Sequence, residues 1–405
     1  MKTILVVSTL DTKGVETIYL SNKIKEIGKN SVIIDISMRK SEKIYGDISP
    51  EKVAEAGGSN YKEILSSKER AKNTAIMTKG AINIALDLWK RGELDGIVGI
   101  GGSTGSLMAT DIMRALPFGV PKLMISSTAA LPGMSTRYID IGDIALFHSV
   151  VEISGLSDIL KNVIDRGAHA ICGMVDAHPI QKTKDRAKHK AIALTMLGPC
   201  EKCASYVRTQ LETKGFQVIG FSAAGMGDRA MELMISQGFF DGVIDLAPGG
   251  VIEHIIGGMR DAGPHRLEAA SNAGIPQIIS TCGVNHITPP KSKYTDDHKS
   301  RRKYDLDKFR TWLRASPDEL KLAARAFAEK LNNSVQPVKV IIPMKGWSSV
   351  DTPGSITYDP QEDKVFVDEL RKAIKQGIDI IEIDANMEDQ LFAESVVKES
   401  LKVFE

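Results

Sequence analysis

Short runs rich in Ile and Val alternate with longer segments of helical periodicity along the chain, and this alternation limits the possible folds more than any other feature. It is the pattern of βαβ units, in which crossover helices join parallel strands. Several of the runs are apolar at consecutive positions, which is typical of strands buried on both faces. We therefore expect an α/β protein with mostly parallel sheets and helices on both sheet faces.

The expected strands form two series. In the first half they lie at 3–9, 31–36, 95–100, 122–126 and 143–147, and in the second half at 191–197, 216–221, 242–246, 277–280, 338–343 and 379–383. Residues 69–90 are predicted to form a long amphipathic helix. Residues 156–175 are predicted to form a helical segment that Gly167 and Gly173 interrupt.

A polar and basic segment at 178–190 separates the two series and is the expected linker. At roughly 100 to 200 residues per domain, a chain of 405 residues has room for two or three domains. We place an N-terminal α/β domain at 1–180 and a C-terminal α/β domain at 190–405. The polar stretches 282–308 and 345–360 are predicted to be long loops, which inside a compact domain are often functional.

The charge balance excludes a large class of partners. The chain has 52 Lys and Arg against 51 Asp and Glu, so its net charge of +1 provides no global field to attract nucleic acid or an anionic membrane. Its four cysteines are too few for a disulfide framework, and no apolar run reaches the roughly 18 to 20 residues of a membrane helix. We expect a cytoplasmic homo-oligomer that binds neither nucleic acid nor membranes.

Cys200 and Cys203 have the CxxC spacing of many zinc ligands. A structural zinc site needs a second pair of ligands, and no matching pair is present in the sequence. No metal site is therefore predicted at these cysteines.

Polar turns follow three strands of the first half, at 9–14 (TLDTKG), 101–106 (GGSTGS) and 126–128 (SST). Ligands of open parallel sheets bind at the carboxyl ends of the strands, and glycines let backbone N–H groups approach an anion at the positive start of a helix. The GGSTGS turn is the best phosphate-binding candidate, although its glycines would equally suit a tight turn without a ligand. Asp11 and Lys13 could position phosphates, directly or through Mg²⁺, or could lie in a solvated turn.

The second half has a similar turn, in which Gly225 and Gly227 precede Arg229. A guanidinium group there could bind a carboxylate or phosphate, or form a surface ion pair. His286, in the segment GVNHITPP, is the best candidate for a general acid or base, with an ordinary loop histidine as the alternative.

Arg314, Asp351 and Gly354 lie in or beside loops that follow other second-half strands. Because parallel strands present their carboxyl ends at one sheet edge, these residues could join Arg229 and His286 around a small anionic ligand. His286 and Asp351 would then be the catalytic candidates, and the other residues would bind substrate. Structural ion pairs that close the long loops are the alternative.

Five segments together resemble the family of two-domain ATP-binding proteins typified by the tomato tobamovirus-resistance protein: VVSTLDTKG, GIVGIGGSTGS, PKLMISSTAA, GFSAAGMGDRAMEL and SVDTPG. They span essentially the whole chain and keep the order of the family's motifs. The resemblance implies two Rossmann-like domains, with ATP bound by the N-terminal one. It implies no particular reaction.

Carried over residue by residue, the resemblance implies an ATP site made of three turns. Its residues are Thr9, Asp11, Thr12, Lys13, Gly101, Gly102, Ser103, Thr104, Gly105, Ser126, Ser127 and Thr128. Mg²⁺ is expected to accompany ATP if a phosphoryl group is transferred, since a bridging metal offsets the developing charge.

The chain departs from the family pattern at Ser222, Leu306 and Asn386, where the family has histidines, and at Asp228, where it has glycine. The loss of three histidines together suggests that they share one site and that the second domain takes a different ligand. Other residues match the pattern: Arg314, Asp351, Pro353, Gly354, Glu382 and Asp384.

The leading hypothesis is therefore a two-domain ATP-binding enzyme that acts on a small acidic metabolite in the interdomain cleft. The alternative is a nucleotide-gated protein-interaction module without catalysis. A third interpretation, a Rossmann oxidoreductase, lacks the GxGxxG turn followed by an acidic residue in the first unit.

Overall fold

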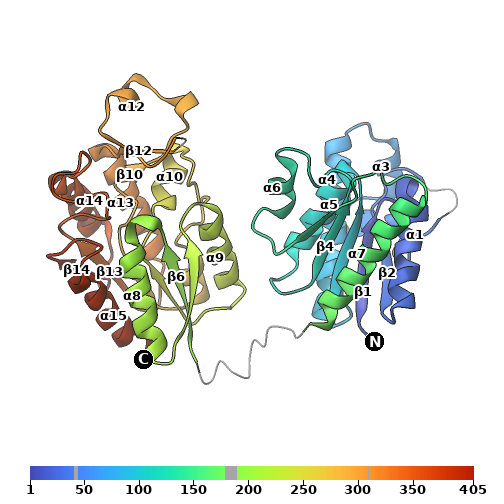
Figure 1. The fold of residues 1–405 in the computed structure, drawn as a ribbon, viewed down its shortest axis with the longest axis horizontal. Helices are drawn as coiled ribbons and strands as arrows, with labels where there is room; N and C mark the ends of the chain where they lie inside the picture. The colour runs from blue at the N-terminus through green and yellow to red at the C-terminus, as the bar shows by residue number, and fades with distance from the viewer. Residues whose placement is uncertain (41–43, 178–188, 309) are drawn as a thin grey trace. The chain divides into compact units, whose positions relative to one another are not determined.

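The computed structural model describes residues 1–40, 44–177, 189–308 and 310–405. The chain divides into two compact units, Met1–Ile180 and Gln181–Glu405, which we call the N-terminal and C-terminal units (Figure 1). Residues 178–188, most of the expected linker, lie outside the described residues.

The N-terminal unit is built on a five-stranded parallel sheet in the order β2-β1-β3-β4-β5. Its strands are β1 Thr3–Ser8, β2 Asn30–Asp35, β3 Gly96–Gly101, β4 Lys122–Ser126 and β5 Ala145–His148. Its helices are α1 Leu10–Glu26, α2 Pro50–Ala56, α3 Tyr61–Ser66, α4 Arg70–Lys90, α5 Ser103–Ala115, α6 Met134–Ile139 and α7 Asp158–Asp176.

The C-terminal unit has a six-stranded parallel sheet in the order β14-β13-β9-β8-β6-β7 and a small antiparallel sheet in the order β10-β12-β11. The strands are β6 Ala191–Met196, β7 Gln217–Ser222, β8 Gly242–Asp245, β9 Gln277–Ile279, β10 His286–Ile287, β11 Lys303–Asp305, β12 Thr311–Arg314, β13 Val338–Pro343 and β14 Asp379–Ile383. The helices are η1 Gly198–Cys200, α8 Glu201–Thr213, α9 Met226–Ser236, α10 Gly250–Ile256, α11 Ala269–Ala273, η2 Lys291–Lys293, α12 Asp296–Ser300, α13 Pro317–Leu331, α14 Pro360–Ala373 and α15 Gln390–Phe404.

The α/β class and the mostly parallel sheets are confirmed. The physical basis is visible in β1, where Ile4 and Val6 pack into one buried cluster and Leu5 and Val7 into another on the opposite sheet face. A strand with apolar side chains on both faces is stable only where helices cover both faces, as they do in this unit. Within the part of the chain that the structure describes, none of the helices has the length and apolar composition that crossing a membrane requires.

Two expectations need correction. The glycines do not interrupt α7, which is continuous, and Gly167 is needed for packing because a Cβ there would lie 2.5 Å from Ile125 Cδ1. The stretch 282–308 is not simply a loop, since it contains β10 and β11 and pairs with β12.

Both units wind in the same way. In each, the first strand lies between the second and the third, so the chain moves outward in one direction and then reverses. Such a reversal creates a crevice at the carboxyl ends of the two inner strands. The crevice of the N-terminal unit lies beyond β1 and β3, and that of the C-terminal unit beyond β6 and β8.

Candidate functional site

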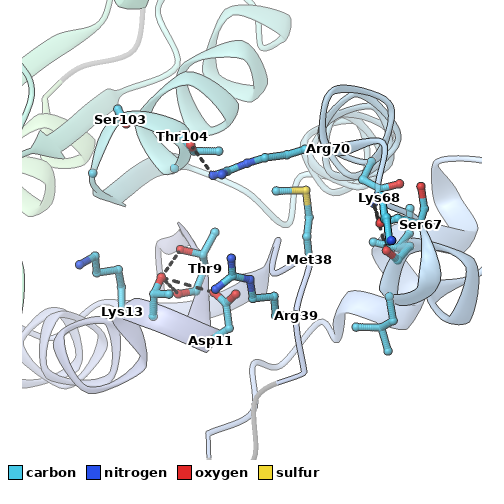
Figure 2. Close-up of a pocket in the computed structure, with 16 residues that line it drawn as sticks. Thr9, Asp11, Lys13, Met38, Arg39, Ser67, Lys68, Arg70, Ser103 and Thr104 are labelled. Atoms are coloured by element: carbon cyan, nitrogen blue, oxygen red, sulfur yellow. Dashed lines mark hydrogen bonds between the residues drawn. The ribbon is translucent and has the colours of Figure 1, made fainter.

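A pocket of about 500 Å³ lies at the reversal point of the N-terminal unit (Figure 2). The turns after β1 and β3 form part of it, and the loop after β2 and the junction between α3 and α4 form the rest. The lining residues are Thr9, Asp11, Thr12, Lys13, Met38, Arg39, Ile64, Leu65, Ser67, Lys68, Arg70, Asn73, Gly102, Ser103, Thr104 and Gly105.

The glycine turn leaves the start of α5 without a side-chain cap. Gly102 is the N-cap residue, and no side chain in the described part of the chain accepts a hydrogen bond from the first turn of the helix. Backbone N–H groups at a helix start have no partner within the helix, and they carry the positive end of its dipole. Because this end of α5 borders the pocket, it can bind an anion.

Two glycines of this turn have no evident role in the fold itself. Neither Gly102 nor Gly105 has a positive φ. A Cβ at Gly102 would come no closer than 3.9 Å to another residue, and one at Gly105 no closer than 4.0 Å. By contrast, a Cβ at Gly99 in β3 would lie 2.6 Å from Met124 Sδ. The glycines at the pocket therefore leave room for something other than the protein.

The pocket is strongly cationic. Four of its lining residues are basic, namely Lys13, Arg39, Lys68 and Arg70, and Asp11 is the one acidic residue among them. Among the residues that the structure describes, no carboxylate lies within ion-pair distance of any of the four. Cations left without carboxylate partners around one pocket favour a ligand that carries several negative charges.

The four cations differ in how they are held. The Arg70 guanidinium, at the start of α4, donates to Thr104 Oγ1 at 3.1 Å and so reaches the glycine turn (Figure 2). Tyr61 donates its hydroxyl to the carbonyl of Arg39 at 2.8 Å and anchors that loop. The Lys13 ammonium donates to the Ile153 carbonyl, so in this structure it points away from the other cations.

Asp11 is held on the β1–α1 turn by its neighbours. Its backbone N–H donates to Ser37 Oγ at 3.1 Å. Burial raises the pKa of the Asp11 carboxyl, while hydrogen bonds from Thr12 and Ser37 and the charge of Arg39 lower it. With the neighbouring threonine hydroxyls, this carboxylate offers the hard oxygen ligands that Mg²⁺ prefers.

The third predicted turn lies beside the pocket rather than in its lining. The Ser126 hydroxyl lies 2.7 Å from Ser106 Oγ and 3.1 Å from Thr128 Oγ1, and Thr128 Oγ1 lies 2.7 Å from the Tyr138 hydroxyl. These contacts join the ends of β3 and β4, so Ser126 and Thr128 stabilise the glycine turn without lining the pocket. Ser127 lies nearer, since its Oγ is the atom closest to a Cβ built at Gly102.

In the C-terminal unit, three predicted residues belong to one buried cluster. Asn285 donates to Asp351 Oδ2 at 2.7 Å and to Asp363 Oδ1 at 3.0 Å, and its own Oδ1 lies 2.8 Å from His286 Nδ1. The Arg314 guanidinium donates to Asp363 at 2.6 Å and lies 3.9 Å from Asp351. All five side chains are buried.

Burial away from water shifts the pKa values of the histidine and the carboxyl groups in this cluster. Burial, together with the charges of Arg314 and Arg260, holds the pKa of His286 well below its usual range. Burial raises the pKa of Asp363 to about 7, although Arg314 opposes the shift. Arg314 also donates to Glu362 and to the carbonyls of Thr357 and Asp359. Its hydrogen-bonding capacity is therefore used within the protein.

The remaining predicted residues of this unit lie on other segments. Arg229 is on α9, with its guanidinium 3.7 Å from Met226 Sδ. Gly225 has a φ of +88° and donates its N–H to Asp228 Oδ2 at 2.8 Å, and a Cβ at Gly227 would lie 2.2 Å from the Ser222 carbonyl oxygen. A φ of +93° likewise accounts for Gly354.

Comparison with protein-family models gives two matches that together span nearly the whole chain. Residues 2–179 match the N-terminal domain and residues 189–404 the C-terminal domain of an uncharacterised protein family, UPF0261. The chain belongs to the UPF0261 family. A UPF0261 protein of Clostridium tetani is 32% identical over 406 residues, covering 100% of this chain and 99% of its own.

More distant relatives extend the family to plants. A UPF0261 protein of Brucella suis is 31% identical and covers 96% of this chain and 93% of its own. The ToMV resistance protein Tm-1(GCR237) of Solanum lycopersicum is 30% identical over 338 residues, which are 81% of this chain and 44% of the tomato protein. Among solved structures, a UDP-N-acetylglucosamine 2-epimerase is 11% identical with a TM-score of 0.23, too low to bear on fold or function.

In this UPF0261 protein, eight of the sixteen pocket residues were predictable because they directly follow β1 and β3. The other eight come from the β2 loop and the α3–α4 junction. A signal for them is present, since the basic pair Arg39 and Lys40 follows the second predicted strand and Lys68 and Arg70 precede the long helix. Neither feature resembles a known motif.

Proposed function

We propose that this UPF0261 protein binds ATP at the reversal point of its N-terminal unit, with the phosphates at the start of α5. The observation that carries the proposal is the pair Gly102 and Gly105, whose missing side chains leave open space at an uncapped helix start. Glycine at such positions allows a phosphate to approach the backbone N–H groups closely.

Size and charge support a nucleoside triphosphate. The volume of about 500 Å³ is within the range of small-ligand pockets. Four basic side chains against one carboxylate give the pocket a positive charge that suits a chain of phosphates. Met38, Ile64 and Leu65 supply an apolar wall in the same pocket, against which a base could pack. Asp11 and Thr12 would hold Mg²⁺, which would neutralise charge on the phosphates.

Calorimetric titration of the full chain with ATP and Mg²⁺ tests the proposal. Gly102→Val should abolish measurable binding, because the side chain would occupy the space that the phosphates need. The fold should tolerate the change, since φ at this position is −86° and the nearest atom lies 3.9 Å from a Cβ.

Gly173→Val is the matched control. Gly173 lies in α7 of the same unit, and a Cβ there would meet nothing within 4 Å. It should bind ATP like the unmodified chain. ATP binding that survives in folded Gly102→Val, or that is absent from the unmodified chain, would refute the proposed site.

Two candidate functions differ in the fate of the bound ATP. An ATP-dependent reaction on a small acidic metabolite would use a ligand site in the C-terminal unit. A nucleotide-gated interaction module would need no such site. One observation favours the module: the groups predicted to act on substrate are buried and in contact with other protein groups, namely His286, Arg314 and Asp351. Release of ADP from ATP by the full chain would establish catalysis, whereas stable binding without turnover supports the module.

A further inference from the structure

The small antiparallel sheet of the C-terminal unit ends in an exposed strand. In its order β10-β12-β11, strand β11 pairs on one side with β12, and among the described residues no strand pairs with its other side. Lys303 and Asp305 are exposed, and Tyr304 between them is half-buried. An edge strand of this kind presents unpaired backbone donors and acceptors to another chain.

The pairing with β12 shows which backbone groups are free. Arg314 donates its N–H to the Arg302 carbonyl, and Leu306 donates its N–H to the Arg310 carbonyl. Hydrogen-bonded and non-hydrogen-bonded pairs alternate along an antiparallel ladder. Residues 302, 304 and 306 therefore face β12, and the backbone groups of Lys303 and Asp305 face outward.

These two residues are complementary to themselves. If two copies of β11 pair antiparallel with Tyr304 opposite Tyr304, Lys303 of each copy lies opposite Asp305 of the other. Those are the positions whose N–H and C=O groups face outward, so the same two pairs would form both the hydrogen bonds and the ion pairs. Oppositely charged residues directly opposite one another stabilise a strand pair.

From this arrangement we infer that β11 is a self-association edge through which two copies of this chain pair in a two-fold manner. The result is a six-stranded antiparallel sheet made of two three-stranded sheets. The contact is isologous, because each copy contributes the same strand. The inference does not depend on what the N-terminal unit binds.

Other sheet edges lack this complementarity. At the β2 edge, Asp47 accepts the N–H of Ile33 at 2.7 Å. Ile48 donates its N–H to the Ile33 carbonyl, and its own carbonyl accepts the N–H of Asp35. The outward backbone groups of Ile33 and the N–H of Asp35 are therefore already paired. Strands β5, β7 and β10 carry no Asp, Glu, Lys or Arg, and the charges of β14 are both acidic. Two copies of β14 would therefore bring like charges together, whereas two copies of β11 bring opposite charges together.

Strand β11 has three residues, so the contact is small and we expect a concentration-dependent dimer. Sedimentation velocity of the full chain over a concentration series measures it. Lys303→Asp should weaken dimerisation by about tenfold or more, because it places two carboxylates opposite each other at both ends of the strand pair. Asp305→Lys should do the same with two ammonium groups.

The decisive variant exchanges the two residues, Lys303→Asp with Asp305→Lys. It restores opposite charges in the same register and should recover most of the lost affinity. Lys293→Asp is the matched control, because it makes the same charge change at an exposed lysine of the same stretch, 282–308, outside the strand. Its dimerisation should equal that of the unmodified chain.

A backbone variant tests the pairing without relying on charge. Lys303→Pro removes an outward N–H and leaves the ladder with β12 intact, so the folded variant should lose dimerisation. Circular dichroism spectra and melting temperatures confirm folding for each variant. The inference is overturned if the unmodified chain is monomeric throughout the series, if folded Lys303→Asp dimerises normally, or if the exchanged variant fails to recover.

Discussion

The turns that follow β1 and β3 in the N-terminal unit border an open pocket, whereas the corresponding turns after β6 and β8 in the C-terminal unit are covered by the chain itself. A Cβ at Gly249, after β8, would lie 2.5 Å from the Gly283 carbonyl oxygen. After β6, the Pro199 carbonyl accepts the N–H of Ser349 at 2.9 Å. The same strand order thus gives a crevice in one unit and a filled edge in the other.

The arginines of the two units differ in the same way. Arg70 reaches a hydroxyl at the pocket and, among the described residues, has no carboxylate within ion-pair distance. Arg266 is fully buried and lies 2.6 Å from Asp245, 3.0 Å from Asp228 and 2.9 Å from Glu232. A cation surrounded by carboxylates serves the fold, and a cation without them is available to a ligand.

The largest effect expected from this difference is on stability. Arg266→Met should destabilise the C-terminal unit by about 3–5 kcal/mol, because it leaves buried carboxylates without their cation. Arg70→Met should change stability by no more than about 0.5 kcal/mol. Urea unfolding in a Trp89→Phe background measures the first, since the remaining tryptophans, Trp312 and Trp347, both lie in the C-terminal unit.

Similar losses of stability in Arg266→Met and Arg70→Met would contradict this difference between the two arginines. An Arg266→Met variant that unfolds at the same urea concentration as the unmodified chain would show that burying the three carboxylates does not require the arginine.

The next largest effect is on the affinity for ATP. Arg70→Met and Arg39→Met should each weaken ATP binding about tenfold or more, because hydrogen bonds to charged groups contribute about 1.5–3 kcal/mol. Arg91→Met is the matched control, since Arg91 follows the opposite end of α4 and pairs with Asp87 and Glu93. Calorimetry at low and high salt should show that the unmodified chain loses affinity with salt and that the pocket variants lose less.

Much of the fold follows from local sequence. The strands β4, β13 and β14 begin and end where the apolar runs predict. In β4 and β13 nearly all residues are buried, as is typical of parallel strands with both faces covered. The short strands β10 and β11 were not predictable in this way. They have only two and three residues, and they form through pairing with β12, which lies elsewhere in the sequence.

The candidate site divides along similar lines. Residues that directly follow a strand, such as Asp11 and Gly102, were predictable because topology alone puts them at the sheet edge. The structural role of Arg314 was not predictable, because its partner Asp363 is 49 residues away in the sequence and only the folded chain brings the two together. The residue type is the same for a ligand-binding arginine and a structural one, so contacts decide between them.

Two buried carboxyl groups of the C-terminal unit also predict a response to pH. The pKa of Asp363 is about 7 in the folded chain and that of Asp228 about 6, both raised chiefly by burial from a usual value near 3.8. A carboxyl with a raised pKa holds its proton more tightly when folded, so the stability that these two carboxyls contribute declines as the pH rises from about 4 to 7. His286, whose pKa is lowered, contributes in the opposite direction, because its neutral form is favoured when folded. Asp363→Asn should make the stability of the C-terminal unit less dependent on pH in this range.

Melting temperatures measured from pH 5 to pH 8 check this expectation. Some dependence should persist in Asp363→Asn, because Asp228 still titrates. An unchanged dependence of the melting temperature on pH in the Asp363→Asn variant would contradict the expected contribution of Asp363.

The smallest effect compares one glycine from each reversal point. Gly105→Ala should stabilise the N-terminal unit by about 0.5–1 kcal/mol, because alanine favours a helix and the nearest atom, Thr9 Oγ1, lies 4.0 Å from the new methyl group. Gly250→Ala should instead destabilise its unit by about 1–3 kcal/mol, because the methyl group would lie 2.5 Å from Ala262 Cβ.

The opposite signs of these two effects separate a ligand-related glycine from a structural one. A glycine that the fold does not need, at a helix start where alanine would be more stable, is explained if a ligand occupies that space. Gly105→Ala should accordingly gain stability and lose ATP affinity together, which urea unfolding and calorimetry on the same sample can measure. A destabilised Gly105→Ala would give that glycine a structural role, and the pocket would then lose one of the two residues on which the ATP proposal rests.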